Sequence, residues 1–198
     1  FRTCVLNAIV WTAKLEVPKG GVKSLPNPTT RLSGRPPASP KGKLAPQGKL
    51  APAKNALFAS KLITARTPGH AVEVSAKIKG AKDLYLVIAD GDGSISCDWA
   101  DWAEPRLVDE KGKETKLTDL KWKSASTGWG RIGINKNCGG QPLKINGKPV
   151  AYGIGAHANS VIHYELPKGH KFVKFLARGG LDDGGSRQQG GSKTSVQF

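Results

Sequence analysis

Residues 153–166 read GIGAHANSVIHYEL, and the second half of this stretch has the alternation of a β-strand. Every second residue there is apolar, which places Ile162, Tyr164 and Leu166 on one face and polar side chains on the other. Such a pattern is typical of a strand that buries one face and exposes the other. The stretch therefore predicts a half-buried strand in a β-sheet protein.

The first half of the stretch predicts a turn, because Gly153 and Gly155 stand two residues apart and glycine accepts backbone conformations that other residues disfavour. This turn would hold His157 near the end of a strand. A histidine can donate one hydrogen bond and accept another, which suits a sugar hydroxyl. The alternative is that His157 bonds to the backbone and only stabilises the turn.

Short apolar or alternating segments recur from about residue 70 onward, and turn residues separate them. Because no helical pattern interrupts this series, we expect residues 63–198 to form an all-β domain, an antiparallel β-sandwich or jelly roll. The strands expected besides the one quoted above are 72–78, 84–89, 106–108, 120–124, 143–145, 172–177 and 194–198.

The first 62 residues have a different composition. Residues 1–17 place apolar side chains at helical spacing and predict one isolated amphipathic helix. Residues 18–62 hold most of the 13 prolines, and proline fixes φ and removes an amide donor, so we expect a disordered linker there. Of the net charge of +16, residues 1–62 carry +10 and residues 63–198 carry +6.

This charge distribution does not favour nucleic acid as a partner, because the basic linker lacks interleaved aromatic residues that could stack on bases. A zinc site is not favoured either, since Cys4, Cys97 and Cys138 lie far apart in the sequence. No apolar run approaches the roughly 20 residues that a membrane span needs.

Several blocks resemble the NPCBM family of carbohydrate-binding modules. They are the Gly-x-Gly-x-His-Ala-x-Ser segment at 153–160, Phe-x-Ala at 175–177, the aspartate pair at 182–183 and Val-x-Phe at 196–198, in this order. Together with tryptophan motifs near residues 122 and 129, the resemblance covers roughly 117–198. It implies a jelly roll like that of galactose-binding domains, and a binding role without catalysis.

One departure from the family concerns the order of its strands. In the family a further pair of strands follows the Val-x-Phe strand, which ends here at Phe198. Residues 72–108 are similar to the closing strands of the family. We therefore expect a permuted or truncated module in which residues 72–108 form sheet contacts with residues 117–198.

A second, shorter resemblance involves the N-terminal residues. Residues 1–11, FRTCVLNAIVW, resemble the final helix of ThuA-like domains. This implies that residues 1–17 are the remnant of a neighbouring domain, and that the rest of the parent polypeptide is a partner of the module.

Sugar recognition requires flat aromatic faces and a few fixed polar groups. Trp99, Trp102 and Trp129 lie in segments predicted as loops and are candidates for stacking, with a structural role as a lid on the sandwich as the alternative. The polar candidates are His157, Asn159, Arg178, Asp182 and Asp183, most of them in or beside a glycine-rich loop at 178–191. For Arg178 the structural alternative is an ion pair with one of the two aspartates.

Four carboxylates stand close together in the sequence, at Asp90, Asp92, Asp98 and Asp101. They suggest one calcium ion, and the resemblance to jelly-roll sugar modules supports this, although the glutamate of an EF-hand loop is absent. The alternative is a pair of ordinary Asp-Gly turns.

The sequence thus predicts a non-catalytic module that targets a larger protein to glycans, possibly galactose-like ones, outside the cell or in a periplasm. One alternative is a structural β-domain without a ligand. Another is an enzyme fragment, either with His157, Ser160 and Asp182 as a hydrolytic set or as the accessory part of a hydrolytic enzyme whose catalytic domain is absent here. Asp182 and Asp183 do not fit a glycosidase pair, because adjacent residues of an extended chain point to opposite sides.

Overall fold

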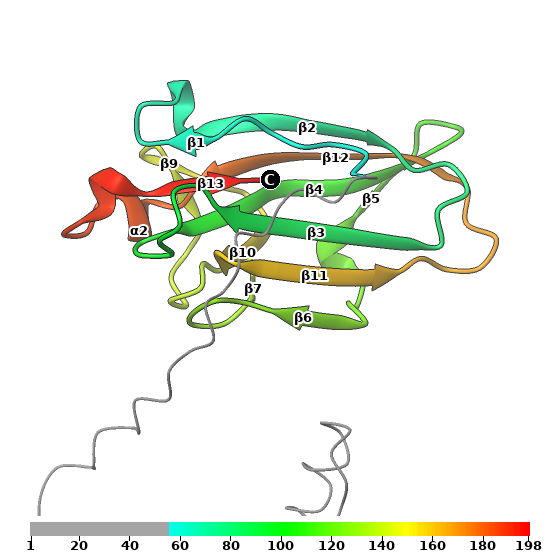
Figure 1. Cartoon of the computed structure of the whole chain (residues 1–198). Helices are drawn as coiled ribbons and strands as arrows, with labels where there is room; N and C mark the ends of the chain where they lie inside the picture. The colour runs from blue at the N-terminus through cyan, green and yellow to red at the C-terminus, as the bar shows by residue number, and fades with distance from the viewer. Residues whose placement is uncertain (1–55) are drawn as a thin grey trace, which may run out of the picture. The chain divides into compact units, whose positions relative to one another are not determined.

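In the computed structural model, which describes residues 56–198, two antiparallel sheets face each other (Figure 1). The first sheet has the order β1 (Ile63–Thr64), β13 (Ser195–Gln197), β3 (Asp83–Asp90), β11 (Ser160–Glu165) and β6 (Ser124–Ser126). The second has the order β2 (Ala71–Lys77), β12 (Phe172–Leu181), β4 (Trp99–Asp109), β10 (Gly153–His157) and β7 (Gly133–Ile134), with β5 (Glu114–Lys116) also paired to β4.

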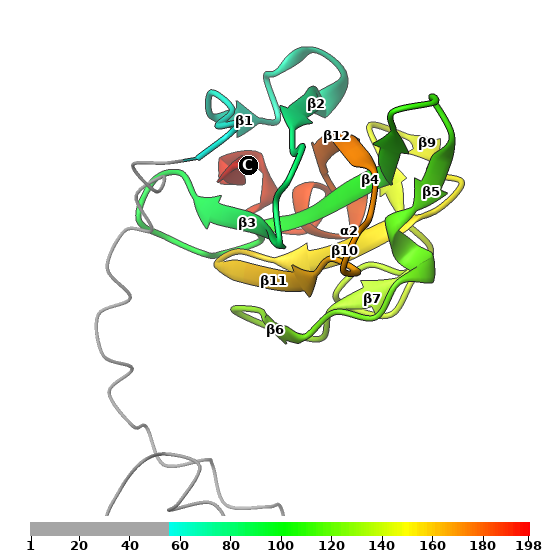
Figure 2. The same ribbon diagram turned by 90° about the vertical axis from the view of Figure 1, so that its right-hand side faces the viewer.

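The remaining elements are short and lie between these strands. They are the hairpin of β8 (Lys144–Ile145) and β9 (Lys148–Pro149), the helix α2 (Asp183–Ser186), and the 3-10 turns η1 (Pro68–His70), η2 (Leu117–Asp119) and η3 (Gly191–Lys193). The two-layer arrangement is visible nearly end-on in Figure 2. The predicted antiparallel β-sandwich is confirmed.

The core lies between the two sheets and follows from the alternation read in the sequence. In the register of β3 with β11, Leu86 is opposite Ile162 and Leu84 is opposite Tyr164. All four side chains are buried, because residues directly opposite each other in a sheet point to the same face. The second sheet contributes Ile154 and other buried residues to the same hydrophobic cluster.

The prediction of a turn at residues 153–157 is wrong, because this segment is the fully buried strand β10. It pairs with β4 on one side and with β7 on the other. The glycines serve close packing, since a Cβ atom on Gly155 would lie 2.4 Å from the carbonyl oxygen of Lys136. A central strand of this kind has no exposed face, so its sequence does not alternate.

The predicted loops around Trp99, Trp102 and Arg178 are also corrected. Both tryptophans belong to β4, and Arg178 belongs to β12. Trp102 is buried and makes edge-to-face contacts with Phe175 and Phe198, at centroid distances of 6.0 and 4.9 Å. These three aromatic rings form part of the core, so Trp102 offers no exposed ring on which a sugar could stack.

Strands from residues 72–108 pair with strands from residues 117–198, as a permuted module requires. The pairs are β2 with β12, β3 with β11, and β4 with both β10 and β12. The permutation itself stays a prediction. No helix in the part of the chain that the structure describes is long and apolar enough to cross a membrane.

The folded region also includes residues upstream of 63. Phe58 packs against the core, and the buried Ser60 donates its backbone N–H to the carbonyl oxygen of Phe198 at 2.7 Å. Residues 1–55, which include the predicted helix and most of the predicted linker, lie outside the described residues.

Ile154 of β10 lies opposite Ile134 of β7. Substituting each of them tests whether β10 is buried. Ile154 is 0% exposed and Ile134 is 36% exposed. We expect Ile154→Ala to lower the free energy of unfolding by about 2–4 kcal/mol, because it leaves a cavity in the core, and Ile134→Ala to lower it by less than about 1 kcal/mol. Urea denaturation of both variants measures this, and similar losses for both would contradict the assignment.

Candidate functional site

Three of the candidate side chains form one aromatic cluster, which we call the aromatic platform: Trp99, Trp129 and His157. The rings of Trp99 and Trp129 stack with centroids 5.3 Å apart and an angle of 26° between their planes. The His157 ring lies 5.9 Å from Trp129 at 57°. Trp129 is 54% exposed, so much of its surface is open to a ligand.

Backbone packing fixes the position of Trp99, which is the first residue of β4. Cβ atoms on Gly139 and Gly184 would lie 2.6 and 2.8 Å from carbon atoms of its indole ring, and one on Gly185 would lie 2.8 Å from its Cβ. Three glycines therefore let the main chain contact this side chain closely. Trp99 is thus held in place by the main chain, and its ring stacks against that of Trp129.

His157 is buried at the end of β10 and is bonded to its surroundings. Its backbone N–H donates to Thr127 Oγ1 at 2.9 Å, and that hydroxyl donates to the His157 carbonyl oxygen at 3.1 Å. Its Nδ1 lies 2.6 Å from the Ala158 carbonyl oxygen, so Nδ1 must carry the hydrogen. Burial lowers the pKa of the imidazole below its usual 6.5. The neutral ring then presents Nε2 as a hydrogen-bond acceptor.

Asn159 joins two strands of the first sheet. Its Nδ2 donates to Asp90 Oδ2 at 2.9 Å, and its Oδ1 accepts the backbone N–H of Asp90 at 2.8 Å. This amide is therefore already used in a reciprocal pair. Asn159 therefore stabilises the backbone beside the aromatic platform.

Asp182 and Asp183 hold loops in place by accepting hydrogen bonds from backbone and side-chain donors. Asp182 is fully buried and accepts from Asn137 Nδ2 at 2.8 Å, from the Gly184 N–H at 2.8 Å and from the Lys144 N–H at 3.1 Å. It is also the N-cap of α2.

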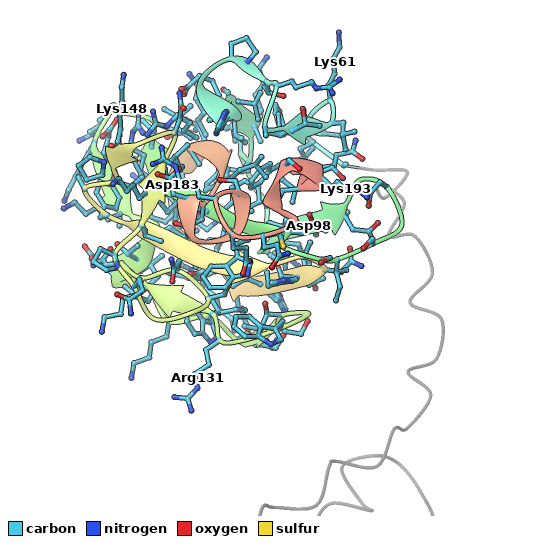
Figure 3. The ribbon with its side chains drawn as sticks, turned by 90° about the vertical axis from the view of Figure 1, so that its left-hand side faces the viewer. Lys61, Asp98, Arg131, Lys148, Asp183 and Lys193 are labelled. Carbon is cyan, nitrogen blue, oxygen red and sulfur yellow. The ribbon has the colours of Figure 1, made fainter. Side chains whose placement is uncertain are left out.

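Asp183 accepts from the Gly147 N–H at 3.0 Å and pairs with Arg187 at 3.2 Å. The predicted ion pair with Arg178 is not among the ion pairs of residues 56–198. Figure 3 views the face that carries Asp183 and Asp98, with Lys148 and Arg131 reaching outward at its margins.

A second carboxyl group, that of Asp101, is buried beside Asp182. Neither of its oxygens has a partner within residues 56–198. Burial and the neighbouring Asp182 raise its pKa well above the usual value. This favours the protonated form of the Asp101 carboxyl, because two adjacent buried carboxylates resist ionising together. Burial likewise raises the pKa of the neighbouring Cys138 thiol to about 12.

The four aspartates proposed for calcium do not form one set. The charges that raise the pKa of Asp98 are those of Asp92 and Asp90, whereas Asp101 faces Asp182. Asp90 already accepts hydrogen bonds from Gly93 and Asn159. The described residues contain no group of three or more acidic, histidine or cysteine side chains that could hold a metal ion. The four aspartates therefore do not fit a site in which all of them bind one ion. Calcium binding stays a prediction.

The hydrolytic set is also not assembled. Nδ1 of His157 bonds to the Ala158 carbonyl oxygen, the Asp182 carboxylate bonds to three donors elsewhere, and the buried Ser160 Oγ has no partner in the described region. A nucleophile, a base and an orienting acid need direct hydrogen bonds in sequence. This arrangement suits binding, with an exposed aromatic face and one neutral acceptor beside it.

Sequence reasoning missed the residues that fix the aromatic platform. Thr127 and the glycines at 139, 184 and 185 have no distinctive motif, and only their three-dimensional neighbours reveal their role. The paired occurrence of Thr127 and Gly128 just before Trp129 was the available signal.

Two comparisons with known proteins found a match to this chain. The model of the NPCBM/NEW2 domain matches residues 50–108 and 113–198. A protein of Renibacterium salmoninarum named "Putative endo-alpha-N-acetylgalactosaminidase" is 34% identical over 110 residues, which are 52% of this chain and 7% of that protein. No solved structure matches the chain.

The raised pKa of Asp98 predicts a pH-dependent stability. The native carboxyl has a pKa of about 7 against 3.8 when unfolded, mainly because it is buried. The native state keeps a proton that the unfolded state releases, so this group lowers stability as pH rises from about 4 to about 7. We expect Asp98→Asn to remove this loss, gaining roughly 2–4 kcal/mol relative to the wild type by pH 8.

Thermal unfolding of both proteins across pH 4–8 measures the effect. Asp119→Asn, at an exposed aspartate, is the matched control. Parallel curves for the wild type and Asp98→Asn would contradict the assignment.

Proposed function

The chain belongs to the NPCBM/NEW2 domain family, and from this premise we propose that it is a non-catalytic carbohydrate-binding module that attaches a larger protein to glycans. The family match includes both sheets of the sandwich and all three residues of the aromatic platform. This binding role requires no bond-breaking chemistry at the aromatic platform.

The observation that carries this proposal is the exposed indole of Trp129, stacked on Trp99 and beside His157. The C–H face of a pyranose packs on an aromatic ring, and its hydroxyls need fixed polar partners. Nε2 of neutral His157 supplies an acceptor for one hydroxyl. Asn159, Asp182 and Asp183 contribute by fixing the loops around the ring, because their polar atoms bond to protein groups.

For the ligand we propose glycans that end in galactose or in alpha-linked N-acetylgalactosamine. The name of the Renibacterium relative supports this class, and the 7% of that protein that is matched suits a separate accessory segment. Such glycans occur on cell surfaces and secreted polymers, so the proposed location is extracellular or periplasmic. The remainder of the parent polypeptide would supply any catalytic activity.

The test is a glycan array probed with the chain, followed by calorimetric titration of the best glycan. We expect Trp129→Ala to weaken binding at least about tenfold, because it removes the stacking face. Its effect on folding should be small, since the side chain is half exposed.

Tyr85→Ala is the matched control, because Tyr85 is 56% exposed and lies on β3, away from the aromatic platform. Equal losses for Trp129→Ala and Tyr85→Ala would contradict the proposed site. If no glycan binds while the chain is folded, the chain is instead a structural β-domain.

A further inference from the structure

Basic side chains lie next to one another on the outer surface of the second sheet, where β2, β12, β4 and β5 follow in this order (Figure 2). Lys77 of β2 is directly opposite Lys174 of β12. Arg106 of β4 is directly opposite Lys116 of β5. Lys174 is also opposite Val108, which is two residues from Arg106, so both pairs point to the same side of the sheet. We call these four basic residues the cationic face.

The cationic face points away from the core. Ala76, Phe175 and Leu107 are sequence neighbours of its members and are buried between the sheets, and successive residues of a strand point to opposite sides. The three lysines are exposed, and the Arg106 side chain is 28% exposed. All four charges are therefore accessible to a partner.

Most of the positive charge on this face is not neutralised by the fold. Like charges directly opposite each other on neighbouring strands are unfavourable, and the cationic face holds two such pairs. Among the ion pairs of residues 56–198, only that of Arg106 Nε with Glu114 Oε1, at 2.9 Å, involves this face. Lys116 Nζ instead lies 4.6 Å from the centre of the Tyr152 ring. An external anion would relieve the repulsion that remains.

The spacing of these charges suits a polymer with repeated negative groups. Neighbouring strands are about 4.8 Å apart, and alternate residues of one strand are about 6.8 Å apart. Further along β12 and β2, Arg178 is opposite Glu73, so the charges there are balanced and the cationic face ends. A single small anion could contact one of the two like-charged pairs, whereas an extended chain of anionic groups could contact both.

The cationic face offers charge and hydrogen-bond donors but no large exposed apolar side chain. The large apolar side chains that are exposed within residues 56–198 are Leu57, Leu62, Tyr85, Trp129 and Ile134, and none of them belongs to β2, β12, β4 or β5. Binding to a membrane surface uses inserted apolar side chains, and single-stranded nucleic acids stack on aromatic rings. Neither mode of binding fits this face.

We propose that the cationic face binds an anionic polysaccharide, one that carries sulfate or carboxylate groups on successive sugars. The basic side chains donate charge-assisted hydrogen bonds to these groups, and added salt weakens the attraction. This second surface is independent of the proposed glycan site, because it shares no residue with the aromatic platform. Arg106 and Trp99 lie in opposite halves of β4, roughly 20 Å apart, so either site can fail its test without the other.

The experiment is calorimetric titration of the 198-residue chain with dextran sulfate at several NaCl concentrations, with neutral dextran of the same length as the reference polymer. We expect the chain to bind dextran sulfate and not dextran. Lys77→Gln combined with Lys174→Gln should weaken this binding at least about tenfold at low salt and make it less dependent on salt, because two cations that release counterions are lost. Without polymer, the Tm of this variant should not fall, since a like-charged pair is removed.

Lys61→Gln combined with Lys193→Gln is the matched control, because it removes the same charge at two exposed lysines outside the second sheet. It should weaken binding by less than about threefold, since only long-range attraction is reduced. The basic residues before position 56 are the same in all variants, so they do not contribute to the difference.

Lys77→Arg combined with Lys174→Arg keeps both charges and should retain binding, which separates the effect of charge from a change in the fold. Equal losses for the two glutamine variants would overturn the proposal. Tighter binding to duplex DNA, or to vesicles of phosphatidylserine, than to dextran sulfate at the same salt concentration would also overturn it, because the partner would then belong to another class.

Discussion

A buried carboxylate at Asp182 constrains the end of the sandwich that carries the candidate site. A charge in this position is tolerated only when donors surround it, and its three donors come from separate segments, at Asn137, Lys144 and Gly184. The β8–β9 hairpin, the segment before it and α2 are thereby tied to the end of β12. Burial and the neighbouring Asp182 raise the pKa of the adjacent Asp101 carboxyl well above its usual value.

The aromatic platform depends on this arrangement because its base, Trp99, is enclosed by the same segments. Gly139 lies two residues after Asn137, and Gly184 lies two residues after Asp182. The hydrogen bonds of the carboxylate hence position the backbone that contacts the indole. A ring held in this way loses little conformational freedom when a ligand stacks on its neighbour Trp129, which favours binding by a shallow site.

The sandwich could be predicted from period-two alternation, which works where a strand has one buried and one exposed face, as in β11. It fails for β10, because residues 153–157 are buried on both faces and their glycines predicted a turn. It fails again at Trp102, because the acidic segment around it predicted a loop, whereas Asp101 is buried and its pKa is raised. Trp129 and His157 could be named from the sequence, but their contact could not, since β10 and the segment after β6 meet only through the fold.

The charge of the groups on the aromatic platform distinguishes the class of ligand better than the net charge of the chain does. The chain carries +16 overall, and lysines and arginines surround the face that holds Asp98 and Asp183 (Figure 3). The platform itself consists of two indoles and an imidazole that burial keeps neutral near pH 7. Exposed cations attract polyanions over long distances but are screened by salt. In the proposed site, close contact would instead be made by uncharged surfaces and one acceptor, which match the C–H face and hydroxyls of a neutral sugar.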